Sequence, residues 1–292
     1  MKKIAISTWC TDDYAEYLRP DKLKKLVNHF HPEIDFHIVD SKQTEQIKED
    51  NPWLKEETVR FADWMMPVSC VPFVEDYDMV MHMDADSFCI GSLDRVINSE
   101  AELIGVRNNN AYGKAGSAQP CVSPFYAPYG DNGTIGVEQF INAGFVASND
   151  KQFWYEWRDF SKFVAEQSDG RTFTYQPWPM IRNEQDTLNH IFHAKDKYTS
   201  EIIDDEGKGV TYGVYNQWGL NSHCESWAEL YMKDGEVYID HPLTKSPLRT
   251  SILHAAGVGT METIKEHGDQ YQWLYDIIDE EVAEHIRSIV GD

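Results

Sequence analysis

The chain has 292 residues, of which 41% are hydrophobic and 13% aromatic. These values exclude a disordered chain, and the length suits one large domain with a sizeable core. Acidic residues outnumber basic ones by 49 to 26, which gives a net charge of −23. Because this charge repels phosphate backbones and anionic lipid, we expect no nucleic-acid partner and no attachment to a membrane surface.

Cysteine usage and the N-terminal sequence both indicate a cytoplasmic protein. The five cysteines are scattered and form no C-x-x-C pair, so neither a disulfide framework nor a zinc site is expected. The apolar run Ile4–Ile6 is too short for the hydrophobic region of a signal peptide. No run approaches the length of a membrane span, and we expect no transmembrane segment.

The chain begins with alternating strand and helix patterns. Strands are expected at Lys3–Thr8 and Asp35–Val39, on either side of an amphipathic helix at Tyr14–His29 that Pro20 breaks or kinks. A strand, a helix and a second strand form the unit of a parallel sheet with a right-handed crossover. The beginning of the chain therefore predicts an α/β core.

The stretch Asp78–Ile90 reads as a buried strand that carries two carboxylates, Asp84 and Asp86, separated by Ala85. Alternation along a strand places both carboxylates on the same face. Two carboxylates this close repel each other unless a proton or a cation lies between them, and Mg²⁺ or Mn²⁺ suits oxygen ligands at this spacing. An acidic turn after a strand is the alternative, because D-x-D alone is a weak signal.

The remaining chain continues with strands, helices and one long polar segment. Residues Arg107–Gly136 are rich in Asn, Gly, Pro, Ser and aromatic side chains, which is typical of a functional loop or lid. We find no internal repeat and no linker, so a single domain is expected. The other expected strands are Leu103–Val106, Phe140–Val146, Ile202–Ile203, Tyr212–Tyr215, Glu236–Ile239 and Ser251–His254, and the other expected helices are Glu56–Met66 (ending before Pro67), Asp150–Gln167, Asn183–Phe192 and Thr260–Val290.

Five stretches, taken in chain order, carry a resemblance to a known family. They are an opening loop at Thr8–Tyr14, the D-x-D region at Tyr77–Asp86, an N-A-G segment within Phe140–Gly144, an N-E-Q-D-T-L-N helix at Asn183–Asn189, and an H-x-x-G segment within Leu253–Gly257. Together they resemble GT-A fold glycosyltransferases, and in particular glycosyltransferase family 8, the glycogenin and galactosyltransferase-like group. The resemblance covers most of the chain.

The resemblance implies a GT-A fold, an α/β architecture with a mixed, mostly parallel sheet flanked by helices. One domain would span residues 1–292. Within it, residues 1–106 would form the nucleotide-binding half, residues 107–260 the acceptor and sugar half, and residues 261–292 the C-terminal helices.

The resemblance also implies roles for individual residues. Asp84, Asp86 and His254 would hold Mn²⁺ or Mg²⁺ against the diphosphate of a nucleotide sugar, where the ion stabilises the leaving group. For His254 the alternative is an ordinary buried histidine, and for Tyr14, a candidate for stacking on the base, it is packing on a helix face. The candidate donor-binding residues are Thr8, Trp9, Cys10, Tyr14, Arg60, Ala85, Asn142, Gly144, Gln185 and Gly257.

Asp186 and Glu184 are the candidate catalytic residues. Family 8 implies a retaining reaction, but in an inverting one either carboxylate would deprotonate the acceptor hydroxyl. Favourable charge at a helix N-terminus is the alternative explanation for both acids. The chain also departs from the family, since Val258–Met261 stands where a Lys-Pro-Trp segment is usual, so phosphate neutralisation would depend more on the metal.

The leading hypothesis is a metal-dependent glycosyltransferase that moves a sugar from a nucleotide-diphosphate donor, with UDP-sugars first, to a hydroxyl of a carbohydrate or glycan acceptor. A nucleotidyltransferase of similar fold is the first alternative, although Ser7–Tyr14 lacks the glycines and basic residues expected for a triphosphate loop. A non-catalytic carbohydrate-binding protein is the second, although it has no need of paired acids after a buried strand.

Overall fold

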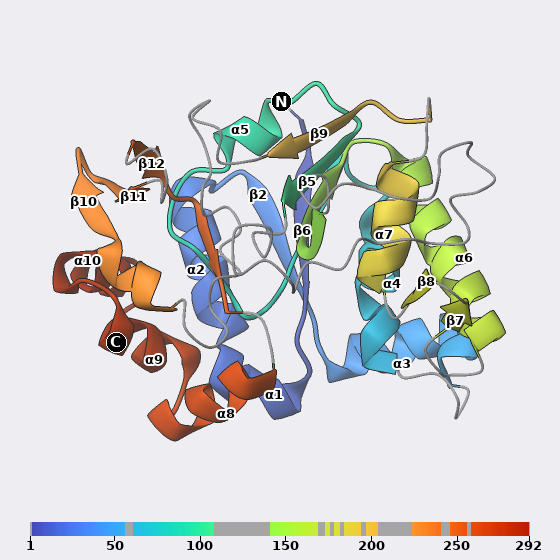
Figure 1. Ribbon diagram of the computed structural model, residues 1–292, viewed down its shortest axis with the longest axis horizontal. Coiled ribbons are helices and arrows are strands. Elements are labelled where there is room, and N and C mark those ends of the chain that lie inside the picture. Colours follow the sequence, from blue (N-terminus) through green and yellow to red (C-terminus); the bar gives the residue numbers. More distant parts are fainter. Residues whose placement is uncertain are drawn as a thin grey trace.

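The computed structural model describes residues 2–55, 61–107, 141–168, 173–175, 178–181, 184–193, 197–203, 224–240, 246–255 and 258–291. A six-stranded sheet with the order β2-β1-β3-β6-β5-β9 forms its centre (Figure 1). In this sheet only β6 runs against its neighbours, because the pairs β2–β1, β1–β3 and β5–β9 are parallel and both β6 pairs are antiparallel. The mixed, mostly parallel sheet expected from the sequence is confirmed. Its strands are β1 (Ile4–Trp9), β2 (Ile34–Val39), β3 (Met79–Met83), β5 (Leu103–Arg107), β6 (Ile141–Ser148) and β9 (Ser200–Ile203).

The helix expected at Tyr14–His29 is two helices, α1 (Asp12–Leu18) and α2 (Pro20–Phe30). Arg19 between them has φ 46°, in the left-handed region, and this ends the first helix. Pro20 occupies the first position of α2, where its missing N–H leaves no hydrogen bond unmade. The expected break at Pro20 is confirmed, and the proline begins the second helix.

Two boundaries expected from the sequence are wrong. Pro67 does not end a helix but lies in the first turn of α4 (Met65–Cys70), where backbone N–H groups need no partner within the helix. Asp78–Ile90 is not one strand, because β3 ends at Met83 and β4 (Ser87–Cys89) begins after a turn at residues 84–86. The apolar residues on both sides of the turn concealed it.

The chain leaves the central sheet at this turn and enters a second ladder. β4 pairs antiparallel with β13 (Ile252–His254), and His254 lies opposite Ser87. Two further ladders lie among the described residues, one of three strands and one of two. Their strands are β10 (Tyr231–Lys233), β11 (Glu236–Asp240), β12 (Pro247–Arg249), β7 (Phe173–Tyr175) and β8 (Trp178–Ile181).

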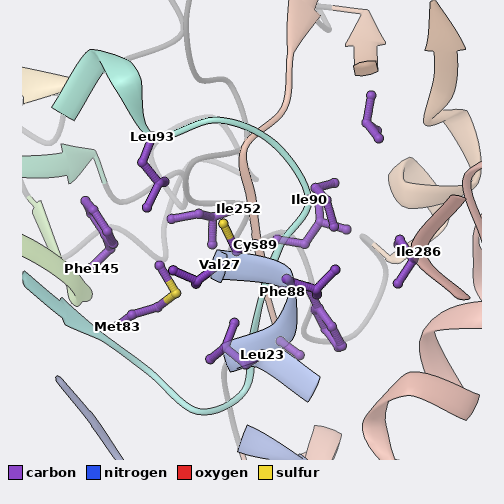
Figure 2. Packing of buried hydrophobic residues seen from close by; sticks show 14 of the residues in the cluster. Leu23, Val27, Met83, Phe88, Cys89, Ile90, Leu93, Phe145, Ile252 and Ile286 are labelled. Carbon is purple, nitrogen blue, oxygen red and sulfur yellow. The ribbon is translucent and has the colours of Figure 1, made fainter. Parts of the chain in front are cut away.

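Helices cover both faces of the sheet, with α2 on one face and α4, α6 and α7 on the other (Figure 1). On the first face, Met83 and Phe145 pack with Leu23 and Val27 of α2 (Figure 2). The second face packs against α6, whose Phe153, Trp154 and Trp157 are fully buried. The region expected to be helical at Thr260–Val290 forms three helices, two of them capped by Asp269 and Asp279. The remaining helices are α3 (Ser41–Asp50), α5 (Asp94–Ile97), α6 (Lys151–Ser168), α7 (Glu184–Phe192), α8 (Val258–His267), α9 (Gln270–Ile277) and α10 (Glu280–Val290), with 3₁₀ turns at Pro52–Lys55, Phe61–Trp64, Val71–Phe73 and Cys224–Glu229.

Some expectations fall outside the described residues. They are the strand at Tyr212–Tyr215 and almost all of the loop at Arg107–Gly136. The division of the chain at residues 106 and 260 stays a prediction. None of the described helices combines the length and the apolar character needed to cross a bilayer.

Candidate functional site

The carboxyl ends of β1 and β3 lie side by side in the centre of the sheet. From β1 the chain moves to β2 on one side, whereas β3 pairs with β1 on the other side, so the connections diverge between these two strands. In open α/β sheets, ligands bind in the crevice that this divergence leaves at the carboxyl ends of the strands. Asp84 follows the last residue of β3 and therefore lies at this edge.

Three candidate ligands converge at the edge. One ligand atom each from Asp84, Asp86 and His254 lies within 4.8 Å of the others. His254 Nε2 is 2.7 Å from Asp86 Oδ1 and 3.3 Å from Asp84 Oδ2. The convergence does not arise from alternation along a strand, as we expected, because the two acids lie in a turn. It arises from the β4–β13 ladder, which the Ala255 N–H extends by donating to the Asp86 carbonyl at 2.9 Å.

The electrostatics of these residues reflect mutual stabilisation of opposite charges. Burial by itself disfavours a charged Asp84, but hydrogen bonds with His254 and His82 outweigh it and hold the pKa of Asp84 below its usual range. Burial likewise disfavours a charged His254, yet the Asp86 and Asp84 carboxylates raise its pKa to about 10. The two carboxylates therefore favour a positive charge between them.

The donor set fits a divalent cation. Two carboxylates supply the hard oxygen atoms that Mg²⁺ and Mn²⁺ prefer, and the imidazole of His254, once neutral, offers a nitrogen. The side chains of Asp84 and Asp86 are 20% and 24% exposed, whereas His254 is buried. The site is therefore open to solvent on the side of the two carboxylates. Asp84, Asp86 and His254, all expected as ligands, are thus brought together.

The residues expected near the sugar, Asn142 and Gly144, are connected to the backbone of Asp84 by hydrogen bonds. The Asp84 N–H donates to the Gly144 carbonyl at 2.8 Å, and the Gly144 N–H donates to Asn142 Oδ1 at 2.7 Å. Asn142 is buried, and its Nδ2 has no hydrogen-bond partner among the residues that the structure describes. Asn142 and Gly144 therefore position the backbone that carries Asp84. The Asn142 Nδ2 group can still donate a hydrogen bond to a ligand.

Helix α7 supports β6 through amide side chains. Gln185 Oε1 accepts from the Ala143 N–H at 3.2 Å. Asn189 makes a pair of bonds with Ile141, accepting from its N–H at 2.9 Å and donating to its carbonyl at 2.8 Å. Glu184 begins the helix, and its side chain is 7% exposed. Gln185, expected as a donor-binding residue, is thus bonded to the strand that holds Asn142 and Gly144.

The expected opening loop, Thr8–Tyr14, contains both buried and exposed residues. Thr8 and Cys10 are buried, and burial, followed by the charges of Asp86 and Asp12, raises the pKa of the Cys10 thiol to about 12. Trp9 donates its indole N–H to Thr44 Oγ1 at 3.0 Å and so packs on α3. Tyr14 is 46% exposed, and the Lys265 ammonium lies over its ring at 5.8 Å from the centroid.

Three expected site residues lie wholly or partly outside the described residues. Arg60 and Gly257 lie outside the described residues, and so does the side chain of Asp186 in α7. Their roles stay predictions.

Two buried residues at the site were missed from the sequence. His82 Nε2 is 2.8 Å from Asp84 Oδ1, and its spacing of two residues from Asp84 is a signal that could have found it. Gln270, the first residue of α9, donates from Nε2 to the carbonyls of Ala85, at 3.0 Å, and of Leu18. Gln270 lies 185 positions from Ala85, and no local pattern predicts that contact.

Comparisons with known proteins bear on the fold. No protein-family model matches the chain, and no curated protein does. The bifunctional glycosyltransferase WbbM is similar in structure over 94% of this chain and 51% of its own, with 12% identity and a TM-score of 0.50. The likeness supports the GT-A fold. The galactosyltransferase LgtC matches 99% of this chain and 97% of its own (16% identity, TM-score 0.48), and the glycosyltransferase GlyE of Streptococcus pneumoniae TIGR4 matches 94% and 63% (16% identity, TM-score 0.47).

Proposed function

We propose that this protein is a metal-dependent glycosyltransferase. It would transfer a sugar from a nucleotide-diphosphate sugar, with UDP-sugars the first donors to test, to a hydroxyl of a carbohydrate acceptor. The observation that carries the proposal is the convergence of Asp84, Asp86 and His254 at the carboxyl edge of a GT-A-like sheet. An acidic pair that only closed a turn would need no buried histidine contributed by a strand 168 positions away.

The proposal assigns the metal and the donor to adjacent groups. Asp84, Asp86 and His254 would hold Mn²⁺ or Mg²⁺, and a bound ion stabilises negative charge on the departing diphosphate. Tyr14 offers an exposed ring for the base. Asn142, whose Nδ2 has no hydrogen-bond partner among the described residues, would orient the sugar, with Gly144 allowing close approach of the backbone.

The acceptor side of the proposal rests on α7. Glu184 is buried, which makes Asp186 the first carboxylate to test as a base if the reaction is inverting. The retaining outcome that family 8 implies requires no such base, and the anomeric configuration of the product distinguishes the two outcomes. We further propose that residues 1–292 act as one domain, with the nucleotide bound by residues 1–106 and the sugar and acceptor by residues 107–260.

A metal and donor screen tests the proposal. We expect Mn²⁺ to raise the melting temperature, one nucleotide sugar to raise it further, and that donor to release its nucleoside diphosphate only when metal is present. EDTA should reverse all three effects. Failure of every UDP-, GDP- and TDP-sugar to bind or react would overturn the proposal.

The same screen separates the alternatives. A carbohydrate-binding protein would be stabilised by free oligosaccharides without metal or nucleotide. A nucleotidyltransferase would release pyrophosphate from a nucleoside triphosphate and a sugar 1-phosphate. Either result, without transfer from a nucleotide sugar, would replace the proposed function.

A further inference from the structure

His82 is a buried histidine on β3 with one polar contact among the described residues. Its side chain is 1% exposed, and its Nε2 lies 2.8 Å from Asp84 Oδ1. Its other ring nitrogen, Nδ1, is buried and has no hydrogen-bond partner in the described part of the chain. On the neighbouring strands its Cα partners are Ser7 and Val146, neither of which holds the ring by a hydrogen bond.

The two oxygens of Asp84 face different histidines. Oδ1 is bonded to His82, whereas Oδ2 faces His254 at 3.3 Å. A neutral imidazole can donate to Oδ1 only in the tautomer that carries its proton on Nε2, and in that tautomer Nδ1 is a bare acceptor. An acceptor without a partner is tolerated in a buried site more readily than an N–H group without one.

We propose that His82 is a positioning residue for the metal site. By donating to Oδ1, it fixes the rotation of the Asp84 carboxylate and leaves Oδ2 directed at the space shared with Asp86 and His254. The proposal rests on the proposed function, because it concerns the same metal. It assigns to His82 no contact with the ion, the donor or the acceptor.

The packing supports this assignment over a purely structural role. The strand positions on either side, Met81 and Met83, are fully buried and apolar, and a leucine at position 82 would fill the interior without burying a ring nitrogen. The imidazole therefore adds one interaction that leucine lacks, and this interaction ends on a candidate ligand. Groups that orient metal ligands commonly affect metal affinity by 10- to 100-fold.

Three substitutions at this position test the proposal. His82→Leu removes the donor, His82→Gln places an amide N–H near the position of Nε2, and His82→Asn has an amide too short to reach Oδ1. We expect the Mn²⁺ dissociation constant, measured from the electron paramagnetic resonance signal of free Mn²⁺, to rise by about 10- to 100-fold in His82→Leu and His82→Asn. His82→Gln should restore most of the affinity.

His190→Phe is the matched control, because His190 is a buried histidine in α7 that is not one of the three candidate ligands. It should leave the Mn²⁺ dissociation constant unchanged. If His82→Leu does not fold, the Mn²⁺ dissociation constants of His82→Gln and His82→Asn are compared instead, and the proposal requires tighter binding by His82→Gln. Equal affinity in the wild type and all folded variants would overturn the role of His82 while leaving the proposed function intact. Absence of Mn²⁺ and Mg²⁺ binding by the wild type would overturn both.

Discussion

His254 Nε2 lies 2.7 Å from Asp86 Oδ1, although the two residues are 168 positions apart in the chain. The contact exists because β13 pairs with β4 and carries His254 alongside the turn that follows β3. The candidate metal site therefore depends on a two-stranded ladder outside the central sheet.

Removing the charge of Asp86 should abolish metal-dependent chemistry. Asp86→Asn preserves the shape of the side chain but removes a charged ligand, and we expect metal-dependent donor cleavage to fall at least about 100-fold. Asp234→Asn removes the same charge at an exposed turn, where φ of 53° suits asparagine, and should leave activity unchanged. Full activity in Asp86→Asn would exclude Asp86 as a ligand.

Gly91 should be essential for the ladder that carries His254. A Cβ at this position would lie 2.6 Å from the Thr250 carbonyl oxygen and 3.2 Å from Ser251 Cα, which are backbone atoms that cannot rotate away. We expect Gly91→Ala to lower the free energy of unfolding by about 1–3 kcal/mol and to weaken Mn²⁺ binding, because β13 is displaced. Gly235→Ala, with positive φ but open space around it, should lower stability without changing Mn²⁺ affinity. Equal Mn²⁺ affinity in both variants would contradict this.

Asn189 should stabilise β6 through its paired bonds with Ile141. Asn189→Ala leaves the buried Ile141 N–H and carbonyl without these partners, and we expect a loss of about 1–3 kcal/mol in denaturant unfolding. Gln152→Ala, at an exposed position of α6, should change stability by less than about 0.5 kcal/mol. A loss in Asn189→Ala no larger than in this control would show that α7 does not hold the strand.

His190 should make stability depend on pH in the acidic range. It is buried against Phe160, with ring centroids 4.5 Å apart, and burial, with a smaller effect of Lys197, lowers its pKa from 6.5 to about 4. Between these values the unfolded chain binds a proton that the folded chain does not, so stability falls as pH decreases through this window. The full effect is on the order of 3 kcal/mol, because each unit by which the pKa is lowered corresponds to about 1.4 kcal/mol.

Urea unfolding of the wild type and of His190→Phe at pH 7, 6 and 5 measures this contribution. The wild type should lose more stability than the variant as pH falls, because phenylalanine cannot take up a proton. Parallel curves for the two proteins would show that His190 titrates normally in the folded state.

The order of strands and helices was largely predictable from the sequence, because hydrophobic periodicity and breakers are local signals. Pro20 marked the break between α1 and α2, and the helix expected at Asp150–Gln167 is α6. Periodicity failed at residues 84–86, where apolar residues on both sides of the turn conceal a change from one sheet to another.

The ligands of the candidate site were predictable from motifs, but their supports were not. Asp84, Asp86 and His254 belong to short sequence motifs. Gln270 contacts Ala85 from a helix far along the chain, and no short motif marks that contact. Even the convergence of the ligands has a different cause from the expected one, since the pairing of β13 with β4 produces it.

The Gln270 amide also changes how the C-terminal helices should be regarded. Its Nε2 donates to the carbonyls of Leu18 and Ala85, so the beginning of α9 links the end of α1 to the turn at residues 84–86. Residues 258–291 are therefore not an appendage that can be trimmed to obtain a smaller catalytic core. A fragment that ends at β13 would keep all three candidate ligands. It would lose the hydrogen bond from Gln270 to the turn that carries Asp84 and Asp86.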